Sequence, residues 1–237
     1  MKKHLIFFAL AATSFSAAAQ SPAVASAARP TAATSAAAAP AAYTDMMAAT
    51  ITELHSTGDP AQLKQLASKF ERASTVVPAD WHPSYYQAYA LLINCFTSKE
   101  DGDAKDKTLD QAEVALARAR KLGGEPSELL VLQAYLYQAR LGISPMMRSM
   151  KYSALVTEAL TEAKKLNPTN PRIYLVQANN LYYTPKMFGG GADVAKPLYE
   201  EGKVRFAAFK PSGPLAPNWG ERQLLGRLKQ YDATAAK

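Results

Sequence analysis

The residues best suited to chemistry in this sequence are its single cysteine, Cys95, and the histidines His55 and His82. A cysteine thiol becomes a nucleophile when a neighbouring histidine deprotonates it in a partly exposed, electropositive setting. Cys95 instead lies in the apolar run ALLINCF, where a cysteine typically packs as a small hydrophobic residue. We therefore expect a structural role for Cys95, with a thiol nucleophile that uses His55 or His82 as its base as the alternative.

A glycine-rich segment at residues 188–191, FGGG, is the second candidate for chemistry. Backbone N–H groups of such a loop bind phosphate when the loop leads into a helix. Here no Lys-Ser or Lys-Thr pair follows, and Asp193 would repel phosphate while it caps the next helix itself. The favoured interpretation is a tight loop in which the glycines adopt positive φ angles.

Other patterns that would support catalysis or metal binding are missing from the sequence. It contains no His-Glu-x-x-His segment, no paired cysteines, no Gly-x-Ser-x-Gly elbow and no Walker loop. Acidic pairs such as Glu200 and Glu201 lie in a segment that is charged throughout, which is typical of a solvated helix surface. We therefore expect no enzyme activity, no catalytic residue, no bound metal and no cofactor.

The composition indicates a folded protein with a hydrophobic core, because 48% of the residues are hydrophobic and 20% are charged. The net charge of +7 is spread over segments that also carry acidic residues. Such a distribution does not predict the one-sided basic surface that binds nucleic acid. With one cysteine, the fold must be stabilised by packing rather than by an intramolecular disulfide bond.

Residues 1–19 have the pattern of a secretory signal peptide, in which two lysines precede the apolar run LIFFALAA and small residues form a cleavage site before Gln20. Residues 20–42 are rich in alanine and interrupted by proline, which predicts a disordered linker. No later stretch has the roughly 20 apolar residues that a membrane helix needs. We expect an exported protein, periplasmic or secreted, without stable membrane insertion and with its folded domain in residues 43–237.

A repeated pattern runs through this domain at intervals of about 45 residues. Each copy has a large apolar residue, an alanine three positions later, an apolar residue three positions after that, and then a proline or glycine. The three copies are Phe70, Ala73 and Val76; Leu116, Ala119 and Leu122; and Leu160, Ala163 and Leu166. Proline at the start of the preceding helical segments divides the chain into helix pairs.

The pattern resembles the tetratricopeptide repeat (TPR) family, in which small and large residues alternate in two antiparallel helices and a proline follows. The matching structural positions are Phe70, Ala73, Ala88, Leu116, Ala119, Ala134, Tyr137, Leu160, Ala163, Pro168 and Ala178. The resemblance implies an all-α fold, a TPR-like α-solenoid of about four antiparallel helix pairs. A C-terminal helix that begins near Trp219 is expected to cap it, with Trp219 wedged at the end of the stack.

The units are longer than the family repeat of about 34 residues, and the excess lies between the two helices of a unit. The three enlarged connections are TSKEDGDAKDKT, LGISPMMRSMKY and YTPKMFGGGADV. We expect the first to be a solvated loop and all three to lie along one edge of the solenoid. The second and third carry apolar residues that we hypothesise to form a recognition surface, with packing against the helix ends as the alternative. These candidate residues are Met146, Met147, Arg148, Met187 and Phe188.

The resemblance also implies a concave groove lined by the first helix of each pair. The expected lining residues are Tyr86, Tyr89, Gln133, Tyr135, Tyr174, Gln177, Asn179 and Asn180. Tyrosine and asparagine provide contact area and hydrogen bonds on a preformed surface. The leading hypothesis is a non-catalytic module that binds a protein or peptide partner in the cell envelope. The alternative is a protein that binds a small ligand or glycan fragment between the groove and the enlarged connections.

Overall fold

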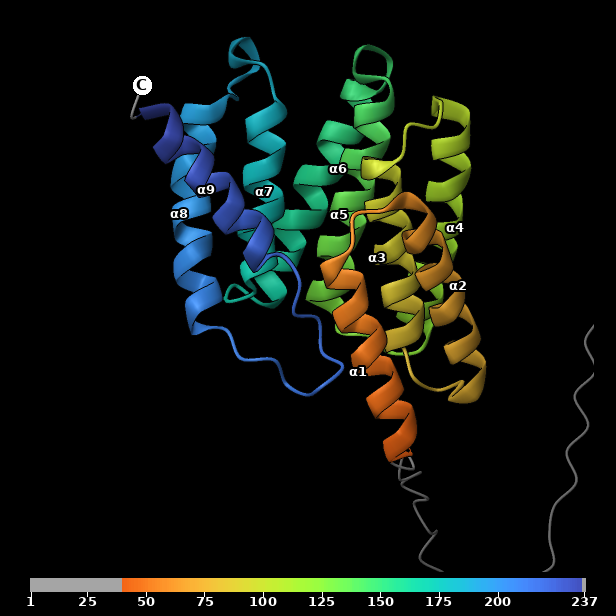
Figure 1. Cartoon of the computed structure of the whole chain (residues 1–237). Helices are drawn as coiled ribbons and strands as arrows, with labels where there is room; N and C mark the ends of the chain where they lie inside the picture. The colour runs from red at the N-terminus through yellow and green to blue at the C-terminus, as the bar shows by residue number, and fades with distance from the viewer. Residues whose placement is uncertain (1–39, 236–237) are drawn as a thin grey trace, which may run out of the picture. The chain divides into compact units, whose positions relative to one another are not determined.

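The computed structural model describes residues 40–235, and this part of the chain folds into α-helices without any strand (Figure 1). The expected signal peptide 1–19, and the linker 20–42 except for its last three residues, lie outside the described residues. The all-α prediction is confirmed. The helices are α1 (Ala41–Ser56), α2 (Pro60–Val76), α3 (His82–Thr97), α4 (Gly102–Lys121), α5 (Pro126–Ile143), α6 (Pro145–Leu166), α7 (Pro171–Tyr183), the 3-10 helix η1 (Lys186–Phe188), α8 (Ala192–Ala208) and α9 (Glu221–Ala235).

The starts of the helices follow from local sequence. Asp59 caps α2 by accepting a hydrogen bond from the Gln62 backbone N–H at 2.8 Å, and Pro60 occupies the first helical position. A proline also lies in the first turn of α3, α5, α6 and α7, where a backbone N–H would have no helical partner. None of the described helices is both long enough and apolar enough to span a bilayer.

The helices pack as successive pairs, α3 with α4, α5 with α6 and α7 with α8, while α2 packs on α3 (Figure 1). The repeat alanines lie where the helices approach each other, since Ala119, Ala134 and Ala163 are fully buried. The third apolar position of the repeat differs from the expectation. Val76 and Leu166 are exposed because each lies at the end of its helix, beyond the crossing.

Substitution of Ala163 by leucine should lower the free energy of unfolding by about 1–3 kcal/mol, because the added atoms overpack a helix crossing. The Ala163 carbonyl accepts a hydrogen bond from Ser127 at 3.1 Å, so the end of α6 lies directly against the start of α5. Ala154→Leu is the matched control, since Ala154 is exposed on the same helix. Urea denaturation should separate the two variants, and equal stabilities would show that the repeat is wrongly placed.

The enlarged connections are mostly helix, which corrects the expectation of a loop at the first of them. Helix α4 begins at Gly102, where Asp101 caps it, so only residues 98–101 are irregular. Helix α6 begins at Pro145, two residues after α5 ends at Ile143. The extra residues therefore lengthen α4, α5 and α6 instead of forming long loops.

The third connection, between α7 and α8, is a tight loop that contains η1. Gly189 and Gly191 have φ angles of 80° and 114°, and a Cβ atom on Gly190 would lie 2.3 Å from the Thr184 carbonyl oxygen. The glycines are therefore required by the backbone, as the tight-loop interpretation predicts. Asp193 is not the cap of α8, because Gly191 holds that position and Asp193 pairs with Lys186 at 3.1 Å.

The chain after α8 returns across the helix pairs before α9 begins (Figure 1). Within this return segment, residues 209–220, the Ala216 carbonyl accepts a hydrogen bond from the Tyr86 hydroxyl on α3 at 3.1 Å. Trp219 lies between Tyr89 of α3 and Tyr135 of α5, which corrects its expected place at the end of the stack. Helix α9 packs against α8, as a terminal helix should. The return segment thus covers part of α3 and α5, where the family resemblance places the groove.

Candidate functional site

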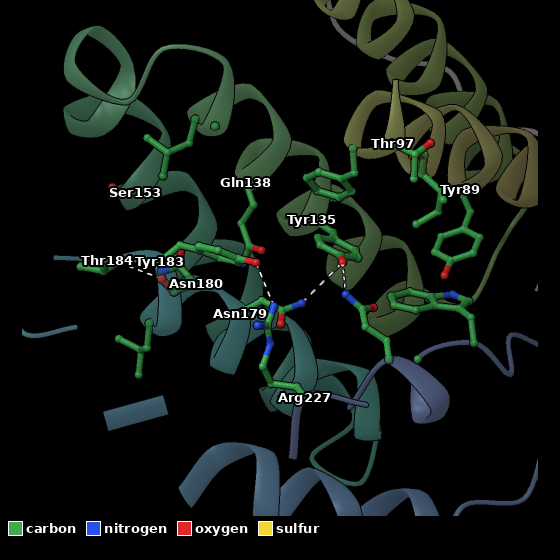
Figure 2. Close-up of a pocket in the computed structure, with 18 of the residues that line it drawn as sticks. Tyr89, Thr97, Tyr135, Gln138, Ser153, Asn179, Asn180, Tyr183, Thr184 and Arg227 are labelled. Atoms are coloured by element: carbon green, nitrogen blue, oxygen red, sulfur yellow. Dashed lines mark hydrogen bonds between the residues drawn. The ribbon is translucent and has the colours of Figure 1, made fainter. Parts of the chain in front are cut away.

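A cavity of about 1550 Å³ is lined by residues from several of the helices (Figure 2). Its walls come from α1, α3, α5, the first half of α6, α7, the loop after α7, and residues 218–227. Helices α2, α4 and α8 contribute none of the described lining residues. The first helix of each of the last three pairs therefore faces the cavity. Ordinary small-molecule pockets measure about 300–1,000 Å³, so this cavity suits a large ligand.

Four aromatic rings form a row along one wall, Tyr89–Trp219–Tyr135–Phe96. The ring centroids of Tyr89 and Trp219 are 4.6 Å apart with an angle of 23° between the planes, and those of Trp219 and Tyr135 are 5.9 Å apart with 19°. Phe96 extends the row at 5.1 Å from Tyr135. Tyr89, Trp219 and Tyr135 are buried, whereas Phe96 is 44% exposed. Because stacked rings hold each other in place, the three buried rings form a rigid aromatic support, and Phe96 is the ring that is substantially accessible.

Trp219 is held by a buried polar network. Its indole N–H donates to the Tyr85 hydroxyl at 2.9 Å, and Tyr85 donates to Glu128 at 3.2 Å. Glu128 in turn accepts from the Arg172 guanidinium, whose Nε lies 2.8 Å from Oε2. Burial, with the Glu128 carboxylate next in effect, raises the pKa of the Tyr85 hydroxyl well above its usual value. Tyr85 therefore stays protonated and donates to the carboxylate.

A second network joins α9 to α5 and α7. The Tyr135 hydroxyl accepts from Gln223 at 2.7 Å and from Asn179 at 3.5 Å, as Figure 2 shows. The Asn179 side-chain oxygen accepts from the Tyr199 hydroxyl at 2.7 Å. Burial raises the pKa of Tyr135 to about 12, so the phenol is neutral at physiological pH. These bonds fix the Tyr135 ring within the aromatic row.

His55 lies on the cavity wall at the end of α1. Burial lowers the pKa of His55 to about 4, with contributions from the positive charges of Arg222 and Arg172, so the imidazole is neutral near pH 7. Its Nε2 atom is buried and has no hydrogen-bond partner among the described residues. The Arg222 guanidinium donates to the His55 carbonyl oxygen and so links α9 to α1.

No protein-family model matches the chain, and no curated protein matches it either. Among solved structures, the chain is similar to the HusA haemophore from Porphyromonas gingivalis, with a TM-score of 0.72. The two sequences are 36% identical over 82% of this chain and 94% of that chain. The chain belongs to the HusA family. The likeness to HusA agrees with the all-α fold.

In this HusA family member, four of the eight expected groove residues line the cavity: Tyr89, Tyr135, Asn179 and Asn180. Tyr86 and Tyr174 are buried and do not line it. The return segment covers Tyr86, whose ring also stacks on Phe70 at 5.6 Å. The Tyr174 hydroxyl donates to the Pro168 carbonyl at 3.2 Å. Gln133 and Gln177 are half-buried on helix faces outside the lining.

The residues of the expected recognition surface do not all lie together in the structure. Met146 and Phe188 are exposed and line the mouth of the cavity, while Met147 and Met187 are exposed outside the lining. Arg148 instead pairs with Asp106, at 2.8 Å for one oxygen, and anchors the start of α6. The apolar side chains of this surface therefore remain open rather than packed on the helix ends.

Phe96 and Arg227 also line the cavity without having been predicted, and so does Trp219, for which ligand binding was only the alternative to a structural role. All three lie outside the repeat positions, so the TPR-like pattern carries no information about where they point. Cys95 is buried, and burial raises the pKa of its thiol, in agreement with a structural role. Among the described residues no group of three or more potential metal ligands is clustered.

Proposed function

We propose that the chain is an exported protein that binds haem or a closely related porphyrin in the cavity. The observation that carries the proposal is the large cavity with a rigid row of aromatic rings along one wall. Its support from outside this chain is the 36% identity to a protein described as a haemophore. Small-ligand binding thus takes the place of peptide binding as the leading function.

A porphyrin fits the chemistry of the lining because it is flat, aromatic and mostly apolar. Phe96 presents an accessible ring at the exposed end of the aromatic row. Leu141, Met146 and Met150 add apolar surface from α5 and α6. Methionine adapts its shape to an irregular apolar partner, which suits the rim of such a site.

A peptide in the concave groove fits less well. The groove that the TPR resemblance assigns to a peptide is crossed by the chain's own residues 209–220, which cover Tyr86 and insert Trp219. A peptide laid across the helix pairs would have to displace this segment and the buried network that holds it. If a protein partner binds, Met147 and Met187 are better contact residues for it, because both are exposed beside the cavity.

Titration of the purified protein with haemin should show saturable binding with a Kd of about 1 µM or lower, equivalent to about −8 kcal/mol. Changes in porphyrin absorbance measure binding, and an iron-free porphyrin should also bind because the lining offers mainly apolar and aromatic contacts. The proposal would be contradicted if neither haemin nor the iron-free porphyrin showed saturable binding. A rise in melting temperature with oligosaccharides alone would support the glycan alternative instead.

A further inference from the structure

Arg227 is a half-buried arginine on the cavity wall that lacks an acidic partner. The buried arginines in the described part of the chain form ion pairs: Arg140 with Asp106, and Arg172 with Glu128. No ion pair between Arg227 and a carboxylate occurs among the described residues. A guanidinium partly withdrawn from water and left without a counter-charge favours an anion supplied from outside the chain.

Neighbouring side chains hold the Arg227 guanidinium in place. It lies 4.2 Å from the Tyr182 ring centroid, and it donates to the Tyr183 hydroxyl and to the Gln230 side-chain oxygen, each at 2.8 Å. Figure 2 shows Arg227 reaching from α9 toward Tyr183 and Asn179. Because a guanidinium has five N–H donors and two are used here, three remain for another acceptor. A guanidinium stacked on a ring is pre-organised to bind a carboxylate through two parallel hydrogen bonds.

The cavity lining mixes polar and apolar side chains, and its two arginines come from α9. Asn180 and Thr184 line the α7 side, while α3, α5 and α6 contribute apolar residues such as Phe96 and Leu141 together with polar ones such as Gln138. A cationic group confined to the α9 side suits an amphipathic ligand whose acid groups are gathered along one edge. Arg222 is the other arginine of the lining, and its guanidinium is engaged with the His55 carbonyl oxygen.

We propose that Arg227 binds a carboxylate of the ligand and orients its acidic edge toward α9. The site then selects flat apolar compounds that carry carboxylates, and discriminates against the same ring system without them. This inference rests on the proposed function for the identity of the ring system, since the peripheral carboxylates of haem are its propionates.

The test compares protoporphyrin IX with its dimethyl ester, which has the same rings and no free acid. The wild-type protein should bind the diacid at least about 10-fold more tightly than the ester, because the ester cannot make the charge-assisted bidentate contact. Arg227→Gln should weaken binding of the diacid by about 10- to 100-fold and leave the ester unchanged. Arg227→Lys keeps the charge without the planar fork and should fall between the two.

Lys229→Gln is the matched control, because Lys229 lies on the same helix, carries the same charge and is exposed outside the lining. It should leave the affinity for both porphyrins unchanged. Equal weakening of the diacid and the ester by Arg227→Gln would show a purely structural role and overturn the inference, as would no weakening at all. If the wild-type protein binds neither porphyrin, the proposed function itself fails, and the inference fails with it.

Discussion

Replacement of Glu128 by alanine should lower the free energy of unfolding by about 3–5 kcal/mol, because it leaves the Arg172 guanidinium buried without a counter-charge. Arg172 is 1% exposed and Glu128 is 5% exposed, so water cannot substitute for the missing carboxylate. The Arg172 Nε lies 3.0 Å from one Glu128 oxygen and 2.8 Å from the other. The guanidinium also lies over the Phe209 ring at 4.6 Å, which joins the pair to the return segment.

Urea denaturation of Glu128→Ala and of a matched surface variant, Glu162→Ala, should separate the buried pair from an ordinary one. Glu162 pairs with Lys165 at 3.1 Å on the exposed side of α6, and loss of such a pair costs less than about 1 kcal/mol. Replacing Glu128 and Arg172 together by methionine should recover much of the lost stability, since an apolar pair needs no counter-charge. A loss as small as that of Glu162→Ala would show that the buried pair does not support the fold.

The helix pairs are predictable from the sequence because their determinants are local. Proline at a helix start and alanine at a crossing act within a few residues of their own position, as Pro126 and Ala163 show. The length of an insertion is also visible, but its conformation is not. Residues after Asp101 continue as helix because a cap and a run of good helix formers follow, whereas the same number of residues would also fit a loop.

The candidate site is only partly predictable, because its lining depends on which side of each first helix is covered. Tyr86 and Tyr89 lie one turn apart on α3 and look equivalent in the sequence. The return segment buries Tyr86, whereas Tyr89 remains on the cavity wall beside Trp219. The segment 209–220 does not match the repeat pattern and contains no helical residue, so its path depends on long-range contacts that no local pattern reveals.

Trp219 is the residue whose loss should affect porphyrin binding most, because it joins Tyr89 and Tyr135 into one aromatic row. Trp219→Ala should cost about 3–5 kcal/mol of stability through the cavity that it leaves. It should also weaken porphyrin binding by at least about 10-fold, since both neighbouring rings lose a stacking partner and their fixed positions. Binding is measured by porphyrin absorbance at a temperature where denaturation shows the variant to be folded.

Two further variants separate the role of the ring from the stability of the fold. Trp219→Phe keeps an aromatic ring and removes the N–H that donates to Tyr85, so it should cost about 1 kcal/mol and bind porphyrin almost as the wild type does. Trp219→Leu fills part of the space without a ring and should resemble the alanine variant in affinity while it is more stable. If the folded leucine variant bound porphyrin as tightly as the wild type, the aromatic row would not support the ligand-binding wall. The ordering of affinities, tryptophan close to phenylalanine and both above leucine, therefore tests the row itself and not only the integrity of the cavity.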